Sequence, residues 1–212
     1  MASTDKLLRP LIRFAHERLG LSPNQVSTVA FLIGILAAGV TASGRVLDGL
    51  ILMAVSQIID AVDGGVARTY GLNSPSGEML EIVYDRLSEL SIFLALAYIG
   101  EVSFTMVGLA FIAILLVTIQ RDLSGFDPGF KRFMIYFGYV AGAVFHIRGF
   151  QVALHVVFWA NLIGFIVGTI MADYRLQTEI DAQAILRRER EREAGIPQPP
   201  DDPPSLLSRL FS

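Results

Sequence analysis

The chain of 212 residues contains no cysteine, only three histidines and comparatively little charge. Without cysteine there can be no disulfide framework, so a small disulfide-stabilised secreted domain is excluded. Charged residues make up 17% of the chain and hydrophobic residues 53%, and the mean hydropathy is +0.54. The apolar residues form blocks long enough to cross a hydrocarbon core, which takes about 20 residues per helix. The sequence therefore predicts an integral membrane protein, while its net charge of -3 says little about partners.

Residues 1–21 lack the continuous apolar core of a cleavable signal peptide. They carry apolar residues at helical spacing, interleaved with basic ones. This pattern predicts an amphipathic juxtamembrane helix in the headgroup plane, with its cations toward anionic lipid; packing of the stretch on the bundle is the alternative. Next, Ser22 suits a helix N-cap, Pro23 the first helical position and Gln25 the reciprocal capping site. In the amphipathic pattern of residues 1–21, the apolar residues are Leu7, Leu8, Leu11, Ile12, Ala15 and Leu19, and the basic residues are Lys6, Arg9, Arg13 and Arg18.

Six apolar segments are candidates for membrane spans. They are expected to be helical, because only helices and closed barrels satisfy backbone groups in lipid and these segments lack strand alternation. The fold class predicted is an all-α membrane protein of six transmembrane helices after the amphipathic helix. The segments are residues 25–43, 46–67, 79–100, 104–119, 133–147 and 152–171.

Basic residues are distributed unevenly between the two sides that six spans define. One side holds nine of them together with the end of the chain, whereas the opposite loops hold only Arg45 and Arg148. By the positive-inside rule, both termini are expected in the cytoplasm, in a multi-pass protein of the cytoplasmic (inner) membrane. The nine residues are Lys6, Arg9, Arg13, Arg18, Arg68, Arg121, Lys131, Arg132 and Arg175.

The composition changes after residue 175. Residues 179–193 are highly charged and predict a solvated helix, and residues 197–204 form a stiff proline-rich linker. We therefore divide the chain into the helix of residues 1–21, a six-helix transmembrane domain of residues 22–175 and a cytoplasmic tail of residues 176–212. No chemical role is assigned to the tail.

Acidic residues occur within the second and third spans, where carboxylates are costly and need a reason. Asp60 and Asp63 share one face of the second span, and Glu81 and Asp85 share one face of the third. The connector of residues 69–76 is short, so the two helices are expected to be antiparallel neighbours. The two pairs of acids are therefore predicted to converge near the cytoplasmic surface. Small residues lie on the same two faces: Gly64, Ala67 and Gly77.

Four carboxylates can gather in a medium of low dielectric constant only if cations neutralise them. All four are hard oxygen donors without a nearby histidine or any cysteine, which favours Mg²⁺, with Mn²⁺ or Ca²⁺ as alternatives, over zinc. The small residues leave room for a bulky ligand, and Arg68 is placed to hold a phosphate. This combination predicts phosphoryl-group chemistry.

The order of these residues resembles the signature of the CDP-alcohol phosphotransferase family. That signature reads D-x2-D-G-x2-A-R-x8-G-x3-D-x3-D, and the chain matches its spacing from Asp60 to Asp85, over 26 positions. The resemblance extends to the interfacial first helix, the Pro23-Asn24 element and the six-span layout. It covers nearly the whole chain except the tail and implies that residues 22–175 form the catalytic domain.

The resemblance implies a role for each residue of the signature. Asp60, Asp63 and Glu81 are similar to the family's metal ligands, and Asp85 to the general base, which also shares a metal. Two Mg²⁺ or Mn²⁺ ions would clamp the diphosphate. The implied CDP-binding positions are Gly64, Ala67, Arg68 and Gly77, with Asn24 of the Pro-Asn element close to the nucleotide.

The implied activity is a step of phospholipid biosynthesis. An acceptor alcohol would attack the β-phosphorus of a CDP-linked lipid, and CMP would leave, as in a transferase of the EC 2.7.8 type. The implied partners are the CDP-lipid, a small or phosphorylated alcohol, membrane lipids and a second copy of the chain, and no nucleic acid. The acceptor is left open among glycerol phosphate, inositol phosphate, serine and an archaeal-type lipid partner, and the lipid tails of the donor are not readable.

Glu81 departs from the family signature, which has aspartate at this position. The extra methylene displaces the carboxylate by roughly 1 Å, and a misplacement of that size can cost about a hundredfold in rate. Glu78, one turn earlier, is a second candidate ligand. A catalytically impaired member that still binds metal and CDP-lipid is therefore the first alternative.

Basic residues after the fourth span are candidates for contacts with the phosphate of an acceptor. Family members that accept inositol phosphate use arginines in this region, which makes Arg121, Lys131 and Arg132 the candidates. The alternative is that they are ordinary positive-inside anchors.

Two other classes of protein hold divalent ions among intramembrane acids. Intramembrane prenyltransferases carry their two aspartate motifs on well-separated segments, whereas here both lie within 26 residues. A divalent-cation transporter needs a second access route, and the external half of these spans offers few polar residues. Both classes are therefore disfavoured, the transporter being the one kept as an alternative.

Overall fold

The computed structural model describes residues 3–125 and 130–194, and every regular element in these ranges is helical. The helices, with a short π-helical segment after α1, are α1 (Ser3–Arg13), η1 (Phe14–Arg18), α2 (Pro23–Ala42), α3 (Val46–Tyr70), α4 (Pro75–Tyr98), α5 (Phe104–Ser124), α6 (Lys131–Phe145) and α7 (Gly149–Glu193). Each predicted span corresponds to one helix from α2 to α7, which confirms the all-helical class. The predicted proline-rich linker of the tail lies outside the described residues.

The beginnings of α2 and α4 follow from their capping residues. The Gln25 amide donates to the Ser22 hydroxyl and the Ser22 amide to the Gln25 side chain, which is the predicted capping box. The Gly77 amide likewise donates to the Ser74 hydroxyl at 3.1 Å, with Pro75 in the first turn. Because of this cap, α4 begins four residues earlier than the predicted third span.

Within residues 3–125 and 130–194, four helices are long and apolar enough to cross a membrane by length and composition: α2, α3, α5 and α7. The helices of the other two predicted spans, α4 and α6, are not both long and apolar enough. α4 carries several charges along its length, among them Glu81, Asp85 and Glu89, and α6 has only 15 residues. The coarser prediction of several apolar membrane helices is confirmed, whereas six crossings and cytoplasmic termini stay predictions.

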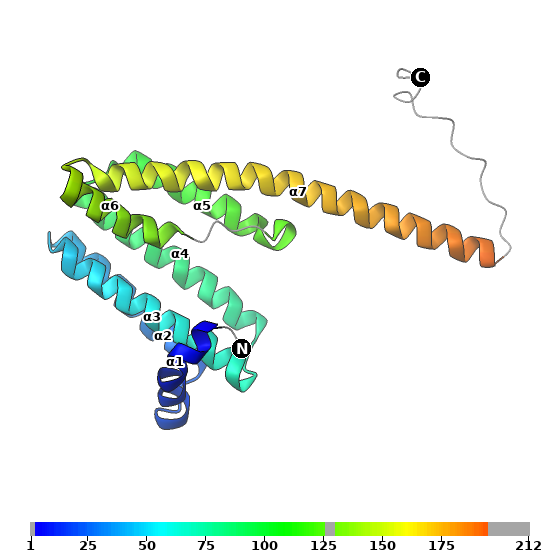
Figure 1. Cartoon of the computed structure of the whole chain (residues 1–212), viewed down its shortest axis with the longest axis horizontal. Helices are drawn as coiled ribbons and strands as arrows, with labels where there is room; N and C mark the ends of the chain where they lie inside the picture. Colours follow the sequence, from blue (N-terminus) through cyan, green and yellow to red (C-terminus); the bar gives the residue numbers. More distant parts are fainter. Residues whose placement is uncertain (1–2, 126–129, 195–212) are drawn as a thin grey trace, which may run out of the picture.

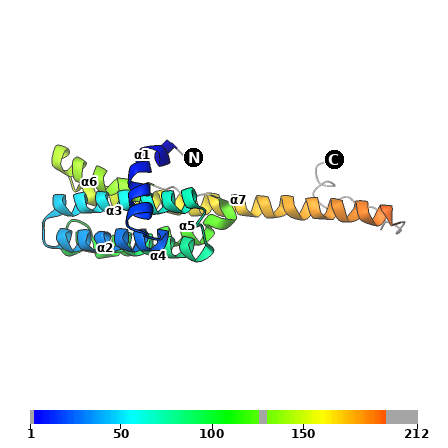
Figure 2. The same cartoon turned by 90° about the horizontal axis from the view of Figure 1, so that it is seen from below.

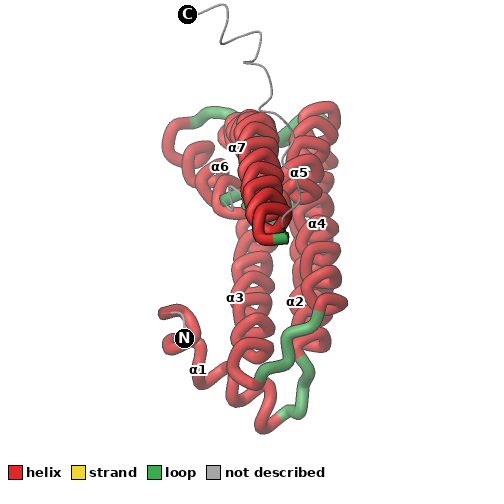
Figure 3. Tube along the Cα trace, turned by 90° about the vertical axis from the view of Figure 1, so that its right-hand side faces the viewer, coloured by secondary structure: helices red, strands yellow, loops and turns green. Residues whose placement is uncertain are grey.

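The helices form two groups that meet at α4 and α5. In the first group, α2 packs along both α3 and α4, and in the second, α7 packs along α5 and α6 (Figure 1). In Figure 3, α3 runs beside the column formed by α2 and α4. The charged helix predicted for residues 179–193 is not a separate element, because α7 continues through it and extends far beyond the bundle (Figures 1 and 2).

The amphipathic N-terminal stretch crosses the C-terminal half of α3 (Figure 2). Ile12 and Ala15 are buried against Val62 and Val66 of α3, and the Tyr70 hydroxyl donates to Glu17 at 2.8 Å. Packing on the bundle, the alternative considered for this stretch, is therefore present. Exposed apolar residues remain on its other side, so a role at the membrane surface stays a prediction; they are Leu11, Phe14 and Leu19.

Polar side chains fix how the helices sit against one another. The Ser56 hydroxyl of α3 donates to the Ala30 carbonyl of α2 at 2.8 Å. The Gln57 side chain donates to the Tyr136 hydroxyl of α6 at 3.2 Å, which links the two groups of helices. Both residues of α3 lie about one turn before Asp60, so these contacts set the depth and rotation of the acidic residues.

A close approach between α2 and α3 depends on a glycine. A Cβ atom at Gly49 would collide with the Thr41 hydroxyl and lie 2.9 Å from the Ala37 carbonyl oxygen. Thr41 is fully buried and already bonded to that carbonyl, so it has little freedom to move.

We expect Gly49→Ala to lower the free energy of unfolding by about 1–3 kcal/mol, because overpacking forces the helices apart. Gly39→Ala is the matched control: apart from the adjoining backbone of its own helix, no atom of the described residues lies within 4 Å of its added Cβ. Alanine in a helix is favoured over glycine by up to about 1 kcal/mol. Thermal unfolding of both variants in detergent measures the difference, and equal stability would contradict the close approach.

Candidate functional site

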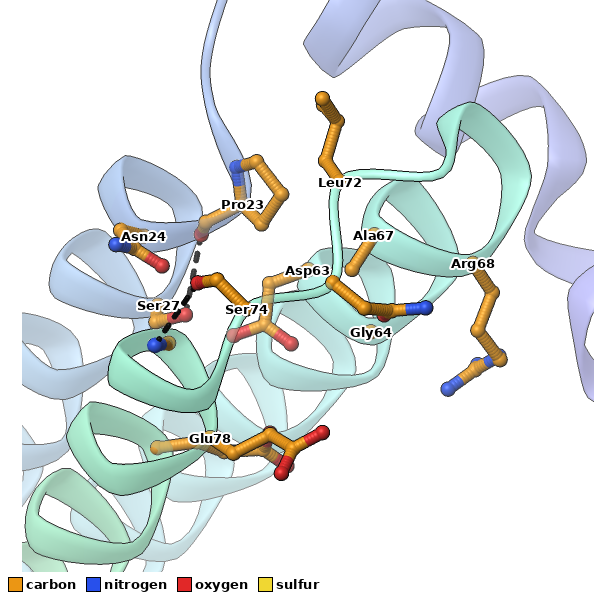
Figure 4. Close-up of a pocket in the computed structure, with 13 residues that line it drawn as sticks. Pro23, Asn24, Ser27, Asp63, Gly64, Ala67, Arg68, Leu72, Ser74 and Glu78 are labelled. Carbon is orange, nitrogen blue, oxygen red and sulfur yellow. Dashed lines mark hydrogen bonds between the residues drawn. The ribbon is translucent and has the colours of Figure 1, made fainter.

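A cavity of about 340 Å³ lies where α2, α3 and α4 meet, beside the loop that joins α3 to α4. Asp63 points into it from α3, and Arg68 lies at its edge (Figure 4). We call it the signature cavity, because most residues of the predicted site line it. Those residues are Asn24, Asp63, Gly64, Ala67, Arg68, Gly77 and Glu81.

The small residues of the signature give the polar side chains room beside the helices. A Cβ atom at Gly64 would lie 3.0 Å from an Arg68 guanidinium nitrogen. A Cβ atom at Gly77 would lie 3.0 Å from both the Asn24 side-chain oxygen and the Ser74 hydroxyl. Glycine at these two positions therefore keeps the walls of the cavity open where Arg68 and Asn24 approach.

The helices that carry the acids are not close neighbours, which corrects the prediction from the connector length. In the described ranges, α3 and α4 pack mainly against α2 and barely contact each other. Gly71, in the left-handed conformation at φ 66°, ends α3 and turns the chain into the loop. The loop is short enough to reverse the chain, but α2 fills part of the space between the two helices, and the signature cavity occupies another part.

The other two acids of the signature face a second cavity, of about 270 Å³, which we call the basic cavity. Arg132 of α6 lies between them: its guanidinium is hydrogen-bonded to Asp85 and lies 3.6 Å from Asp60. The basic cavity is lined by Gln57, Asp60, Asp85, Arg86, Glu89, Lys131, Arg132 and Phe133.

A smaller cavity of about 60 Å³ lies between these two and shares residues with both. Glu81 lines it together with the signature cavity, and Asp85 lines it together with the basic cavity. Arg121 and Thr118 of α5 form its other side. The three cavities thus border one another along α4, with the acids on the borders.

The four signature carboxylates form two pairs in this structure. Among the described residues, no three histidine, cysteine or acidic side chains are grouped closely enough to hold a metal ion. The acids are not grouped more closely because α3 and α4 are apart and because Arg132 lies between Asp60 and Asp85. Asp60 nevertheless lies near enough to Asp63, Glu81 and Asp85 for their charges to repel.

The residues present fit a divalent cation in their chemistry. One oxygen of Asp63 is buried and has no hydrogen-bond partner among the described residues, so it has a lone pair to offer. Asp60 and Asp85 already share one cationic group, the Arg132 guanidinium. Carboxylate oxygens of this kind are the donors that Mg²⁺ and Mn²⁺ prefer. The metal-ligand roles of these acids stay predictions.

Sequence reasoning did not single out Glu89 as a site residue. Its side chain is 4% exposed, and one of its oxygens lies 3.1 Å from an Arg86 nitrogen. Two signals could have found it. Glu89 continues the row of residues four apart that contains Glu81 and Asp85, and it is a carboxylate inside a predicted span.

The predicted acceptor contacts divide between the cavities. Arg121 lines the small cavity with Glu81 and Asp85. Lys131 and Arg132 line the basic cavity, and Lys131 is 3% exposed. All three therefore lie close to the acids.

Residues 21–170 match the family model of the CDP-alcohol phosphatidyltransferases. An archaetidylinositol phosphate synthase from Pyrococcus horikoshii is 35% identical over 129 residues, which is 56% of this chain and 68% of that protein. A bifunctional IPC transferase and DIPP synthase from Rubrobacter xylanophilus is 38% identical over 77 residues, covering 36% of this chain and only 18% of its own length.

The fold is similar to that of solved structures of the Mycobacterium tuberculosis phosphatidylinositol phosphate synthase. The structure with CDP-DAG bound has a TM-score of 0.65 and 14% identity, covering 80% of this chain and 93% of that one. The complex with manganese and citrate has a TM-score of 0.65 and 15% identity, covering 77% and 87%. At this identity the likeness concerns the fold alone.

The family model covers far more than half of the chain and includes the whole signature on α3 and α4. The chain therefore belongs to the CDP-alcohol phosphatidyltransferase family of enzymes and is a multi-pass membrane protein.

Proposed function

We propose that this protein transfers a phosphatidyl-type group from a CDP-linked lipid to an acceptor alcohol and releases CMP. The observation that carries the proposal is the signature cavity, where Asp63, Glu81 and Arg68 face a space kept open by glycines. A solved relative by fold holds CDP-DAG, which supports a donor of this chemical class.

The donor would lie with its nucleotide and diphosphate in the signature cavity. Arg68 supplies a planar cation suited to phosphate oxygens, and Asn24 supplies hydrogen-bonding groups near Gly77. Asp60, Asp63, Glu81 and Asp85 would hold the metal ions. When bound, divalent ions offset the charge of the diphosphate and of the departing CMP.

The reaction exchanges one phosphorus–oxygen bond for another. The hydroxyl oxygen of the acceptor bonds to the β-phosphorus, and the bond from that phosphorus to the oxygen of CMP breaks with its electron pair leaving on CMP. The hydroxyl proton passes to Asp85. Because Arg132 is hydrogen-bonded to Asp85, its guanidinium has to shift before that oxygen accepts the proton.

The acceptor we propose is a phosphorylated alcohol of the inositol phosphate kind. Relatives similar in sequence and in fold are named synthases of inositol phosphate lipids. Arg121 lies beside Glu81 and Asp85 in the small cavity, where a cation can hold an anionic acceptor close to the proposed base.

The proposal also includes the setting of the reaction. We expect both termini and the site on the cytoplasmic side of the cell membrane, two Mg²⁺ or Mn²⁺ ions, and a homodimer. Such a placement gives soluble acceptors and CMP access to the cavities while the lipid tails of the donor stay in the bilayer.

We expect the purified protein to release CMP from a CDP-lipid when Mn²⁺ or Mg²⁺ and inositol phosphate are present. Glu81→Asp restores the usual acid of the signature and is expected to raise the rate, by up to about a hundredfold, because it moves the carboxylate by roughly 1 Å. Asp63→Asn is expected to abolish release, since it removes a proposed ligand charge. Chromatography of CMP provides the measurement.

Asp48→Asn is the matched control, because Asp48 lies at the opposite end of α3 and pairs with Arg45; its rate should equal that of the native chain. If neither the native chain nor Glu81→Asp releases CMP from any CDP-lipid, the transferase proposal is wrong. Metal flux into liposomes without CMP release would instead favour the transporter.

We expect Arg121→Ala to raise the KM for inositol phosphate by about tenfold or more, because a hydrogen bond to a charged group contributes roughly 1.5–3 kcal/mol. The KM for the CDP-lipid should stay unchanged. Steady-state kinetics with each substrate varied in turn separates the two effects. Arg148→Ala, in the loop between α6 and α7, is the control, and unchanged kinetics in both variants would assign Arg121 to anchoring alone.

A further inference from the structure

The basic cavity contains an acid that is not part of the family signature. Glu89 lies one turn of α4 beyond Asp85 and is almost completely buried. Its Oε2 atom has no hydrogen-bond partner of good geometry among the described residues and is held only by an ion pair, 3.1 Å from the Nη1 atom of Arg86, whose Nε atom likewise has no partner. A buried carboxylate whose hydrogen-bonding capacity is only partly used is costly, so a further donor close to Glu89 would stabilise it.

Arg132 connects Glu89 to the two signature acids of this cavity. Its Nη1 atom lies 3.6 Å from Asp60, and its Nη2 atom is hydrogen-bonded to Asp85. Its Nε atom lies 3.7 Å from the other oxygen of Glu89. One guanidinium therefore spans three carboxylates from two helices, with the signature acids on one side and Glu89 on the other.

The charges that line the basic cavity balance without any added ion. Three acids, Asp60, Asp85 and Glu89, face three bases, Arg86, Lys131 and Arg132. A divalent ion at Asp60 and Asp85 would add two positive charges next to the Arg132 guanidinium. Like charges at such range repel strongly where water is largely excluded, so Arg132 has to move away when the ion binds.

We propose that Glu89 is a positioning residue that takes over Arg132 when a divalent cation binds Asp60 and Asp85. The Oε1 atom of Glu89, which already lies 3.7 Å from the Nε atom of Arg132, then receives the guanidinium. This frees the two signature acids and keeps the displaced charge paired. This inference rests on the proposed function, because it assumes that Asp60 and Asp85 hold the ion. In this inference Glu89 affects metal binding, although its side chain contacts neither the metal nor a substrate.

Binding of Mn²⁺ to the purified protein in detergent, in the absence of substrates, tests the proposal. Free Mn²⁺ is followed by electron paramagnetic resonance for the native chain, Glu89→Gln, Arg132→Gln and the double variant. We expect Glu89→Gln to raise the Kd for Mn²⁺ by about thirtyfold in the native background, but by about threefold or less when Arg132 is glutamine, a coupling within the range found for contacting residues. Arg132→Gln alone should tighten binding.

Glu101→Gln is the matched control, since it makes the same change in the turn between α4 and α5 and should leave the Kd unaltered. Thermal unfolding shows whether each variant is folded. If Arg132→Gln does not fold, Arg132→Lys replaces it, and the effect of Glu89→Gln should shrink there too, because a single ammonium group cannot bridge both sides.

The outcomes separate this inference from the proposed function. An equal loss of affinity in both backgrounds would mean that Glu89 acts through its charge alone and would overturn the inference, while metal binding by the signature acids would stand. A native chain that binds no Mn²⁺ would overturn both.

Discussion

The compensation of buried charge is the constraint on which the rest of this structure depends. Helices that are mostly apolar carry Asp60, Asp63, Glu81, Asp85 and Glu89 in one region, and carboxylates inside a membrane protein persist only where cations or hydrogen bonds offset their desolvation. α6 meets this need although it has only 15 residues, because its Arg132 lies beside Asp60, Asp85 and Glu89.

The arrangement of α2, α3 and α4 divides the chemistry between two places. α3 and α4 both pack on α2. As a result, Asp63 faces the signature cavity and Asp60 faces the basic cavity. Asp60 and Asp63 lie less than one turn apart on the same helix, so the two pairs of acids are close to each other along α3. In this structure the Arg132 guanidinium lies between Asp60 and Asp85, where the proposed reaction needs a divalent metal ion.

Much of the fold could be predicted from the sequence, because its signals are local. The capping box of Ser22 and Gln25, the glycine after α3 and the length of the apolar runs all act within a few residues. The separation of α3 from α4 could not be predicted, since a connector length sets the direction of the chain but not which helix lies between. The partners of Arg132 could not be predicted either, because they depend on how α6 is rotated against α4. Asp85, for example, lies 47 residues before Arg132 in the sequence. Glu89 could have been singled out as a candidate from its helical spacing, but its contact with Arg132 could not.

The length of α7 has a mechanical consequence for the end of the chain. Its 45 residues rise about 1.5 Å each, so the helix is roughly 68 Å long, about twice the thickness of a hydrocarbon core. A single uninterrupted helix of this kind cannot lie wholly within one bilayer unless it is strongly tilted. Its charged half extends away from the bundle as a stiff arm, so a protein fused at Glu193 would have little steric access to the three cavities.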